Sequence, residues 1–307
     1  MSIRLITDST CYLPKEYIAK YDISLVSLNV VLNGISYREV DIENKWFYRE
    51  MSKSNEIPTS SQPSIEELYK VIESLIKDNH DVVGIFLSSD MSGTYSSAHL
   101  VKEMILEKYP NANIELIDSR SNCMQMGYAV LEAARAAYLN KSLAEVVNIA
   151  QHTIENSKFI FIPDVLDYLK KGGRIGGASA LLGSMLQIRP ILTVEDGKTT
   201  VLTKVRTKKK AVDKIVDLVM EQNNKKKIKE LIVHHIDCEK EGLELAEKLK
   251  SALSLKEVKI QSTGPIIGLH VGPGSLGVAY HYSNYNNELF FLARCCSYSI
   301  KFILSHF

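Results

Sequence analysis

The chain has 307 residues, of which 45% are hydrophobic and 24% are charged, and these ordinary globular values exclude an intrinsically disordered chain. Its 37 Lys and Arg residues balance 36 Asp and Glu residues to a net charge of +1, which removes any broad electrostatic argument for nucleic acid or an acidic membrane as the main partner. The length indicates two domains of roughly 150 residues each.

The cysteines and the N-terminus favour a reducing compartment. The five cysteines are odd in number and include no CxxC pair, so they suggest neither a disulfide framework nor a zinc ribbon. The opening stretch, MSIRLITDST, reads directly as a strand and lacks the basic and apolar regions of a secretory signal. We therefore expect a cytoplasmic protein.

In the first half of the chain, short apolar runs alternate with amphipathic helices. The pattern predicts strands at residues 3–8, 23–32, 81–89 and 113–119, and helices at residues 14–21, 64–78 and 94–109, followed by two more up to about residue 156. Ser64 and Glu67 form a capping-box pattern, and Asn33-Gly34 is a strong turn signal. Strand, helix and strand at this spacing predict a parallel sheet covered by helices.

From residue 158 the pattern changes to antiparallel pairing. It predicts a strand over 158–164, a helix over 165–173 that is stopped by glycine, a hairpin over 191–205 that turns at Asp196-Gly197, and then a helix, a strand over 229–237, a helix, and two strands that flank the glycine-rich segment 262–277. We expect an α+β domain with a mixed or antiparallel sheet over 158–282, a first domain over 1–157, and the linker ENSK between them.

Residues 283–307 continue neither pattern. Arg294 and Lys301 interrupt their apolar run, which is shorter than the usual ~20 residues of a membrane span. We expect a packed tail, an oligomer-forming tail or an added extension, and the sequence leaves these open.

Four polar clusters follow predicted strands or enter predicted helices. They lie at residues 7–10, 58–64, 88–98 and 118–121. Helix N-termini carry unpaired N–H groups and a partial positive charge, so Ser, Thr and Gly in these places suit an anion. Each cluster alone is explained by N-capping. Several clusters at the ends of one sheet favour a ligand site.

The segment 169–190 contains glycine pairs around Arg174. It lacks the Lys-Ser/Thr of a Walker loop, which argues against nucleotide binding of that kind. A helix C-cap explains Gly172-Gly173 but not the arginine that follows. The apolar side chains after it form either ordinary core, which is the default, or the wall of a hydrophobic pocket: Leu181, Leu182, Met185 and Ile188.

The segment STGPIIGLHVGPGSLG, residues 262–277, surrounds His270 with glycine and proline. Its GPGSLG matches the dinucleotide pattern GxGxxG but precedes a strand, so we reject dinucleotide binding. We interpret the glycines as positions where backbone approaches a ligand closely, with His270 pointing from a rigid loop to a carboxylate. A buried structural histidine is an equal alternative.

Three weaker patterns suggest other chemistry. His234 and His235 are adjacent on a strand and point to opposite faces, so we predict no metal site. Ser92, His270 and Asp8 could form a hydrolase triad, although no GxSxG motif supports it. The lysine runs near residues 208 and 225 are best interpreted as solvated surface, with a regulatory protein that binds a macromolecule as the alternative.

The motifs ITDST, PTSSQPS, SSDMSGTYSSA, YLKKGGRI and GPIIGLHVGPGSLGV, in this order and spacing, resemble the DegV family of bacterial fatty-acid-binding proteins over about residues 3–282. This family includes the binding subunits of the fatty-acid kinase system. The resemblance implies a Rossmann-like α/β domain followed by an α+β domain, with one long-chain fatty acid between them and no other cofactor.

The resemblance also implies which residues meet the ligand. The carboxylate would be bound by Ser60, Ser92 and His270, and this chain has SSQPS where the family commonly has TSQPS, which keeps the hydroxyl and loses a methyl group. Residues at the pocket or on the surface that faces a kinase would be Arg174, Ser61, Gly93, Thr94, Gly268, Leu181 and Met185.

The implied function is that of a non-catalytic carrier. It would present the carboxylate to a separate ATP-dependent fatty-acid kinase for acyl-phosphate formation and lipid synthesis. Its partners would be the fatty acid and that kinase, with no nucleic acid and at most transient membrane contact. The alternative is an esterase-like hydrolase that uses Ser92 and His270.

Overall fold

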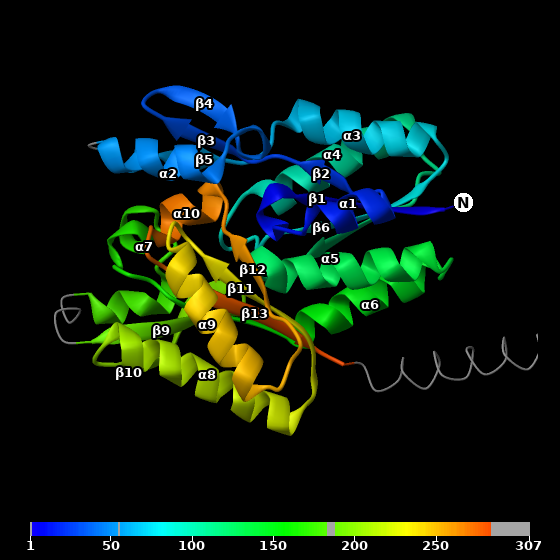
Figure 1. Ribbon diagram of the computed structural model, residues 1–307. Helices are drawn as coiled ribbons and strands as arrows, with labels where there is room; N and C mark the ends of the chain where they lie inside the picture. Colours follow the sequence, from blue (N-terminus) through cyan, green and yellow to red (C-terminus); the bar gives the residue numbers. More distant parts are fainter. Residues whose placement is uncertain (1, 55, 183–187, 284–307) are drawn as a thin grey trace, which may run out of the picture.

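The computed structural model describes residues 2–54, 56–182 and 188–283, which form three β-sheets with helices between and around them (Figure 1). The first sheet is parallel, with the order β2-β1-β6-β7. Its strands are β1 (Ile3–Asp8), β2 (Ser24–Val26), β6 (Asp81–Phe86) and β7 (Ile114–Asp118).

Helices cover both faces of this parallel sheet. They are α1 (Lys15–Tyr21), α3 (Ile65–Lys77), α4 (Thr94–Lys108), α5 (Cys123–Tyr138) and α6 (Leu143–Glu155). Helices α3 and α4 contact one face, whereas α5 and α6 contact the other (Figure 1). The predicted parallel, Rossmann-like arrangement is confirmed.

A second, small antiparallel sheet has the order β4-β3-β5. It consists of β3 (Asn29–Leu32), β4 (Ile35–Arg38) and β5 (Thr59–Ser61), and the same part of the chain contains the short 3-10 segments Ser9–Cys11 and Glu39–Asp41 and the helix α2 (Asn44–Lys53). The turn between β3 and β4 has positive φ at both Asn33 and Gly34, as its sequence predicts.

The single strand predicted over 23–32 is wrong, because the chain leaves one sheet and enters another at Leu28. The Leu28 N–H donates to Ser9 Oγ at 3.1 Å, and the Leu28 carbonyl accepts from the Glu39 N–H at 2.9 Å. Its backbone polar groups are therefore bonded outside both sheets, so β2 and β3 are separate strands.

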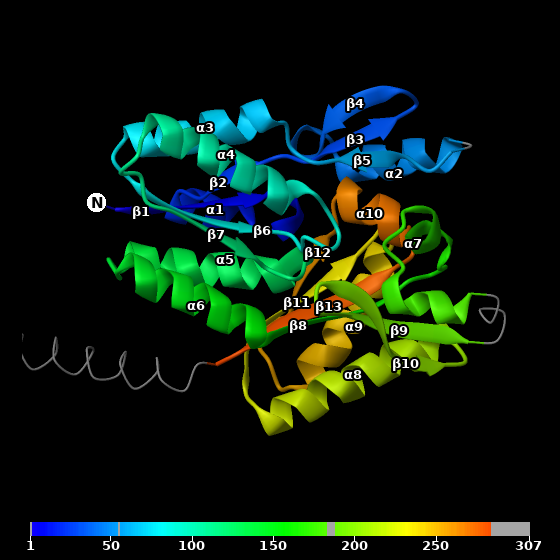
Figure 2. The ribbon, with the colours of Figure 1, turned by 180° about the vertical axis from the view of Figure 1, so that it is seen from behind.

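The third sheet is mixed and has the order β10-β9-β8-β13-β11-β12 (Figure 2). Its strands are β8 (Ser157–Ile162), β9 (Arg189–Glu195), β10 (Lys198–Val205), β11 (Ile228–His235), β12 (Lys259–Ser262) and β13 (Leu276–Tyr282). All pairs are antiparallel except β11 with β12. The predicted α+β character of this half, and with it the fold class, is confirmed.

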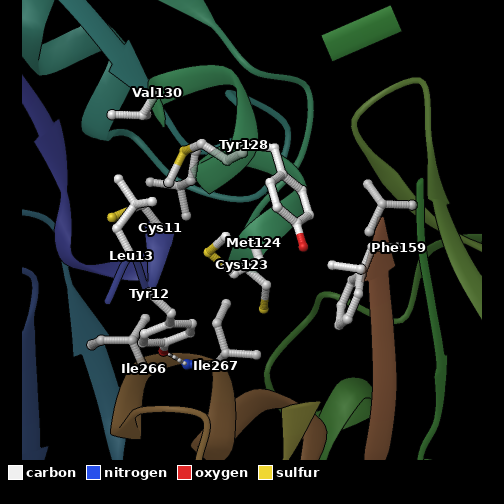
Figure 3. Packing of buried hydrophobic residues seen from close by; sticks show 14 of the residues in the cluster. Cys11, Tyr12, Leu13, Cys123, Met124, Tyr128, Val130, Phe159, Ile266 and Ile267 are labelled. Atoms are coloured by element: carbon white, nitrogen blue, oxygen red, sulfur yellow. Dashed lines mark hydrogen bonds between the residues drawn. The ribbon is translucent and has the colours of Figure 1, made fainter. Parts of the chain in front are cut away.

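Helix α5 lies between the two large sheets, because it contacts β1 on one side and β8 and β13 on the other. Nearly every residue of α5 is buried. Figure 3 shows Met124 and Tyr128 of α5 between Cys11 of the first half and Phe159 of β8. The outer face of the third sheet is covered by α8 (Lys208–Lys225) and α9 (Glu239–Ala252).

Three short helical segments lie near the small sheet and the end of β9: α7 (Asp167–Lys171), the 3-10 segment Gly176–Leu181 and α10 (Pro265–Val271). Helix α10 contacts α2, α7 and β3 (Figure 1). The prediction that His270 projects from a rigid loop is wrong, because Pro265 begins a helix that includes His270.

Two local predictions in the first half have different outcomes. Ser64 caps α3, since its side chain accepts from the Glu67 N–H at 3.1 Å. The Glu67 carboxylate does not complete a capping box; it accepts instead from the Ser27 N–H at 3.2 Å and from Arg38 at 2.7 Å.

Within the described ranges, no helix combines the length and apolar character that a membrane crossing requires. Apart from Ser283, the tail predicted at 283–307 lies outside the described residues.

Candidate functional site

A cavity of about 280 Å³ lies where the end of β6 meets β8, β9 and α10, and we call it the Ser60 cavity. Apolar side chains from both halves of the chain form much of its wall, among them Leu28, Leu87, Phe159, Phe161 and Ile267. Polar lining comes from Ser60, Ser61, Gln62, Ser92, Asn122, Thr199, Arg174 and His270. The cavity thus combines an oily wall with a compact set of hydrogen-bonding groups.

Ser60 and His270 meet in this cavity although 210 residues separate them. Strand β5 holds Ser60 opposite Val30, and α10 carries His270, so that Ser60 Oγ lies 2.9 Å from His270 Nε2. The other ring nitrogen, Nδ1, is buried and has no hydrogen-bond partner among the described residues. A Cβ added to Gly172 would lie 2.3 Å from Nδ1, so glycine is required beside the ring.

His270 is neutral in this environment. Burial and, to a smaller extent, the positive charge of Arg174 lower its pKa to about 4. A buried N–H without an acceptor is less acceptable than an unused lone pair, so we assign the proton to Nε2, which donates to Ser60 Oγ. This leaves the Ser60 O–H free to donate to a ligand.

Arg174 follows the end of α7, and backbone carbonyl groups hold its guanidinium at the cavity. Its Nε donates to the Met91 carbonyl at 3.0 Å, and its Nη1 donates to the Gly172 carbonyl at 2.6 Å. Gly173 has φ of +70°, and this left-handed residue lets the Arg174 N–H return to the Leu169 carbonyl at 3.0 Å. Gly172 and Gly173 therefore end α7 and also direct the Arg174 side chain to the cavity.

Ser92 lies at the N-terminus of α4 and lines the cavity. Its Oγ is 2.9 Å from Thr94 Oγ1 and accepts from the Thr94 N–H at 3.3 Å. A Cβ added to Gly93 would lie 2.2 Å from the Gln62 side-chain oxygen, and Gln62 in turn donates to Ser97 Oγ at 2.6 Å. The TSSQPS and SGTY motifs thus contact one another at the start of α4.

The residues implied by the family resemblance separate into three groups. The cavity lining includes Ser60, Ser61, Ser92, Gly93, Arg174 and His270. Three others lie outside that lining: Thr94, Gly268 and Leu181. Met185 lies outside the described residues.

The three residues outside the lining have identifiable neighbours. Thr94 is fully buried and bonds to Ser92. Gly268 packs on Tyr48, since an added Cβ would lie 2.1 Å from the Tyr48 hydroxyl oxygen. Leu181 belongs to the hydrophobic core. Gly264 and Gly268 of this segment therefore make room for the side chains of Tyr12, Glu39 and Tyr48 rather than for a ligand close to the backbone.

Sequence reasoning missed several lining residues. Gln62 belongs to the polar cluster at 58–64 but received no role of its own, and Asn122 directly follows the cluster at 118–121 and was not identified. Phe159 and Phe161 are two residues apart on β8 and line the same cavity, so alternation along the strand was the available signal.

The hydrolase arrangement of Ser92, His270 and Asp8 is not formed. Asp8 is buried and accepts from the Thr10 N–H at 2.9 Å and the Leu87 N–H at 2.8 Å. Burial raises the Asp8 pKa to about 6. His270 bonds to Ser60, and no carboxylate among the described residues orients its ring. A histidine with a strongly lowered pKa is also a weak general base.

A second group of ionisable residues lies on α5, β11 and β13. Glu132, Glu230 and His281 place potential ligand atoms within 4.8 Å of one another. Arg135 and Lys229 already ion-pair with these carboxylates, Lys229 to Glu132 at 2.8 Å. A metal ion would have to displace both cations, so we interpret the group as an ion-pair network.

Comparison with known proteins identifies the family to which the chain belongs. A model of the DegV family of uncharacterised proteins matches residues 2–283. This chain belongs to the DegV family. A DegV domain-containing protein of Clostridium acetobutylicum is 51% identical over 92% of this chain and 98% of its own length.

Two solved DegV structures have the same fold. DegV of Bacillus subtilis, described as a fatty-acid-binding protein, has a TM-score of 0.81 and 34% identity, and the match covers 92% of this chain and 100% of that one. A stearic-acid-binding protein of Eubacterium ventriosum has a TM-score of 0.80 and 29% identity, and the match covers 91% and 97% of the two chains.

Proposed function

We propose that this chain binds one long-chain fatty acid in the Ser60 cavity, with the carboxylate at Ser60, Ser92 and His270. The observation that carries the proposal is the 2.9 Å hydrogen bond between Ser60 and His270 in a cavity with largely apolar walls. The fatty acids named for the B. subtilis and E. ventriosum relatives support it.

The polar residues would compensate the buried carboxylate. An anion taken from water needs hydrogen bonds or an opposite charge. Ser60 can donate its O–H because His270 donates to its oxygen, and Ser92 lies where the dipole of α4 is positive. Arg174 adds a full positive charge at the cavity. These groups fix the position and charge of the head group.

The acyl chain would supply most of the affinity. Burial of each CH2 contributes about 0.8 kcal/mol, so a long chain gains more from the apolar wall than the head group gains from its hydrogen bonds. The lining side chains come from residues both before and after 157. This supports our proposal that 1–157 and 158–282 are two domains that enclose the acyl chain.

The binding proposal is tested with delipidated protein. Stearate should bind with one molecule per chain in native mass spectrometry, and His270→Ala should weaken the affinity about 10-fold in calorimetry, since Ser60 loses the donor that frees its O–H for the carboxylate. His99→Ala is a matched control, because His99 is exposed on α4. Absence of stearate binding by the wild-type protein would overturn the proposal.

We propose further that the chain is a cytoplasmic carrier and not itself an enzyme, and that it presents the carboxylate to a separate ATP-dependent fatty-acid kinase for acyl-phosphate formation and lipid synthesis. A carboxylate oxygen would attack the γ-phosphorus of ATP and ADP would leave. The sequence contains no Walker loop, which supports a separate source of the nucleotide site.

The carrier role has its own test. Stearate-loaded protein with ATP alone should give no acyl phosphate, and addition of a fatty-acid kinase should give hydroxylamine-trappable product. Hydrolysis of a model ester that disappears in Ser60→Ala or Ser92→Ala would contradict the carrier and favour the hydrolase.

A further inference from the structure

Helix α10 supplies Ile266, Ile267, His270 and Val271 to the Ser60 cavity, so its position sets both the head-group site and part of the apolar wall. It has only 7 residues, and its N-cap residue, Gly264, provides no side-chain hydrogen bond. A helix this short is not stable by itself, and its first N–H groups need partners from elsewhere. The position of α10 must therefore be fixed by its surroundings.

Two side chains from the first half of the chain supply these partners. Glu39 Oε1 accepts from the Ile266 N–H at 2.9 Å, and the Tyr12 hydroxyl accepts from the Ile267 N–H at 3.3 Å (Figure 3 shows the second bond). The Tyr12 hydroxyl also donates to Glu39 Oε1 at 2.9 Å. Glu39 thus bonds to the first turn of α10 both directly and through Tyr12.

The glycine before α10 makes room for this contact. A Cβ added to Gly264 would lie 2.5 Å from Glu39 Oε1 and 2.6 Å from Cε1 of Tyr12. The residues just before the helix are held as well, because the Tyr48 hydroxyl donates to the Thr263 carbonyl at 2.7 Å. A substitution at 264 would push the start of α10 away from Glu39.

The burial of Glu39 costs free energy, so stability alone does not explain it. It is 5% exposed, and its hydrogen-bond partners among the described residues are uncharged donors. Burial, with a smaller contribution from the nearby Asp8, raises its pKa to about 7. A buried carboxyl without a cation costs free energy that an apolar side chain would not.

We propose that Glu39 is a positioning residue, which holds the first turn of α10 so that His270 reaches Ser60 and leaves the Ser60 O–H free for the ligand carboxylate. Glu39 does not line the cavity and so acts on a ligand only through α10. The ligand in this proposal rests on the proposed function, whereas the effect on His270 does not.

The test compares Glu39→Ala and Glu39→Gln without and with stearate. Without ligand, Glu39→Ala should shift the His270 ring resonances in NMR and raise the pKa of His270 toward its ordinary value, because the ring becomes less buried. Glu39→Gln keeps an oxygen that can accept from Ile266 and should leave the resonances close to wild type. With stearate, Glu39→Ala should weaken binding about 10-fold.

A double-mutant cycle separates positioning from general destabilisation. In a His270→Ala background, Glu39→Ala should weaken binding less than ~3-fold further, since coupled residues are not additive. Equal losses in both backgrounds, or an unchanged His270 resonance in Glu39→Ala, would overturn the proposal. If wild type binds no stearate, the proposed function fails, but the NMR comparison still tests Glu39.

A second variant and a control keep the test informative if Glu39→Ala fails to fold. Tyr12→Phe removes the hydroxyl that bonds Ile267 and should shift the His270 resonances in the same direction as Glu39→Ala. Glu67→Ala is the matched control, because Glu67 also accepts from a backbone N–H, that of Ser27, at 3.2 Å, but has no hydrogen bond to α10 among the described residues. It should leave the His270 resonances unchanged, and a shift equal to that of Glu39→Ala would contradict the proposal.

Discussion

Two cavities among the described residues have the same volume, about 280 Å³, and they differ in what lines them. The second, which we call the Tyr128 cavity, lies between α1 and α5 on one side and β11 and β12 on the other, and Lys229, Glu230 and Lys259 line it. All three are ion-paired: Lys229 with Glu132 and Lys259 with Glu16, both at 2.8 Å, and Glu230 with Arg135 at 2.7 Å. The exposed Lys227 and Glu257 line the cavity as well. The two cavities therefore share a volume but differ in their polar groups: charged side chains line the Tyr128 cavity, whereas hydroxyl, amide and imidazole groups predominate in the Ser60 cavity, where we propose that the ligand binds.

Each cavity has a buried neutral histidine beside it. Burial lowers the pKa of both His270 and His281 to about 4. His270 bonds Ser60, whose O–H is then free to donate, whereas His281 Nε2 has no hydrogen-bond partner within the described ranges and lies 3.9 Å from Glu132. The two histidines thus share a similar degree of burial, but His270 belongs to the proposed ligand site whereas His281 lies beside an ion-pair network.

The largest expected effect concerns the apolar wall of the Ser60 cavity. Stearate has six more CH2 groups than laurate, so it should bind more tightly by up to about 5 kcal/mol, or a few thousandfold. Calorimetric or displacement titration of a C12 to C18 series measures this slope. Leu253→Ala, in the Tyr128 cavity, should leave the slope unchanged. Equal affinities for all acids of the series would show that the apolar wall of the Ser60 cavity does not bind the acyl chain.

A second prediction concerns His281 and the stability of the folded chain in acid. An unfolded histidine has a pKa near 6.5, whereas His281 in the folded chain has a pKa of about 4. The folded state therefore binds fewer protons below pH 6.5, and stability present above that pH is lost as the pH falls toward 4. Denaturant titrations should show that His281→Phe removes about 2 kcal/mol of the loss between pH 7 and pH 5.

The pH slope, rather than the absolute stability, is the measurement here, because phenylalanine also changes packing. Asp8 and Glu39 work in the opposite direction, since their pKa values are raised to about 6 and about 7 and their contribution is lost as the pH rises through those values. The same slope in wild type and His281→Phe would show that His281 is not a buried neutral residue.

A third prediction uses the close contact between Gly172 and His270. Alanine at 172 has an allowed backbone, but its Cβ would lie 2.3 Å from His270 Nδ1 and must displace the ring. We expect Gly172→Ala to weaken stearate binding about 10-fold by breaking the bond to Ser60. Gly177→Ala is the control, because its Cβ would meet nothing closer than 3.7 Å. Equal affinities in the two variants would remove His270 from the site.

Much of the fold was predictable because its signals are local. The parallel sheet follows from apolar runs alternating with helices, and both hairpins follow from Asn33-Gly34 and Asp196-Gly197, which have positive φ in the structure. Helix α2 and β5 were not predicted. Strand β5 belongs to the small sheet, whose strands have only 3 or 4 residues, too few for a clear period.

Helix α10 shows why part of the site was not predictable. Its sequence, PIIGLHV, is short and contains a glycine and β-branched residues, so local propensity favours a loop. What makes it a helix is contact with Glu39 and Tyr12, which are 227 and 255 residues away from their partners. The motifs identified Ser60 and His270, but only the tertiary structure pairs them with each other instead of His270 with Ser92.

The smallest expected effect tests the Tyr128 cavity directly. Tyr128 lines it and is only 2% exposed, yet its hydroxyl makes no hydrogen bond with the described residues. The Tyr128 ring packs on His281 with a centroid distance of 4.5 Å, and phenylalanine keeps that contact. We expect Tyr128→Phe to change the free energy of unfolding by less than about 0.5 kcal/mol and stearate affinity by less than ~2-fold.

Denaturant unfolding and calorimetry measure both quantities for Tyr128→Phe, with Ser60→Ala as the contrasting loss of a hydroxyl in the other cavity. Ser60→Ala should weaken stearate binding several-fold, because it removes the O–H that His270 frees for the ligand. A loss in Tyr128→Phe as large as in Ser60→Ala would mean that an unengaged hydroxyl is a binding group in both cavities. The different polar groups that line the Ser60 and Tyr128 cavities would then not determine where the ligand binds.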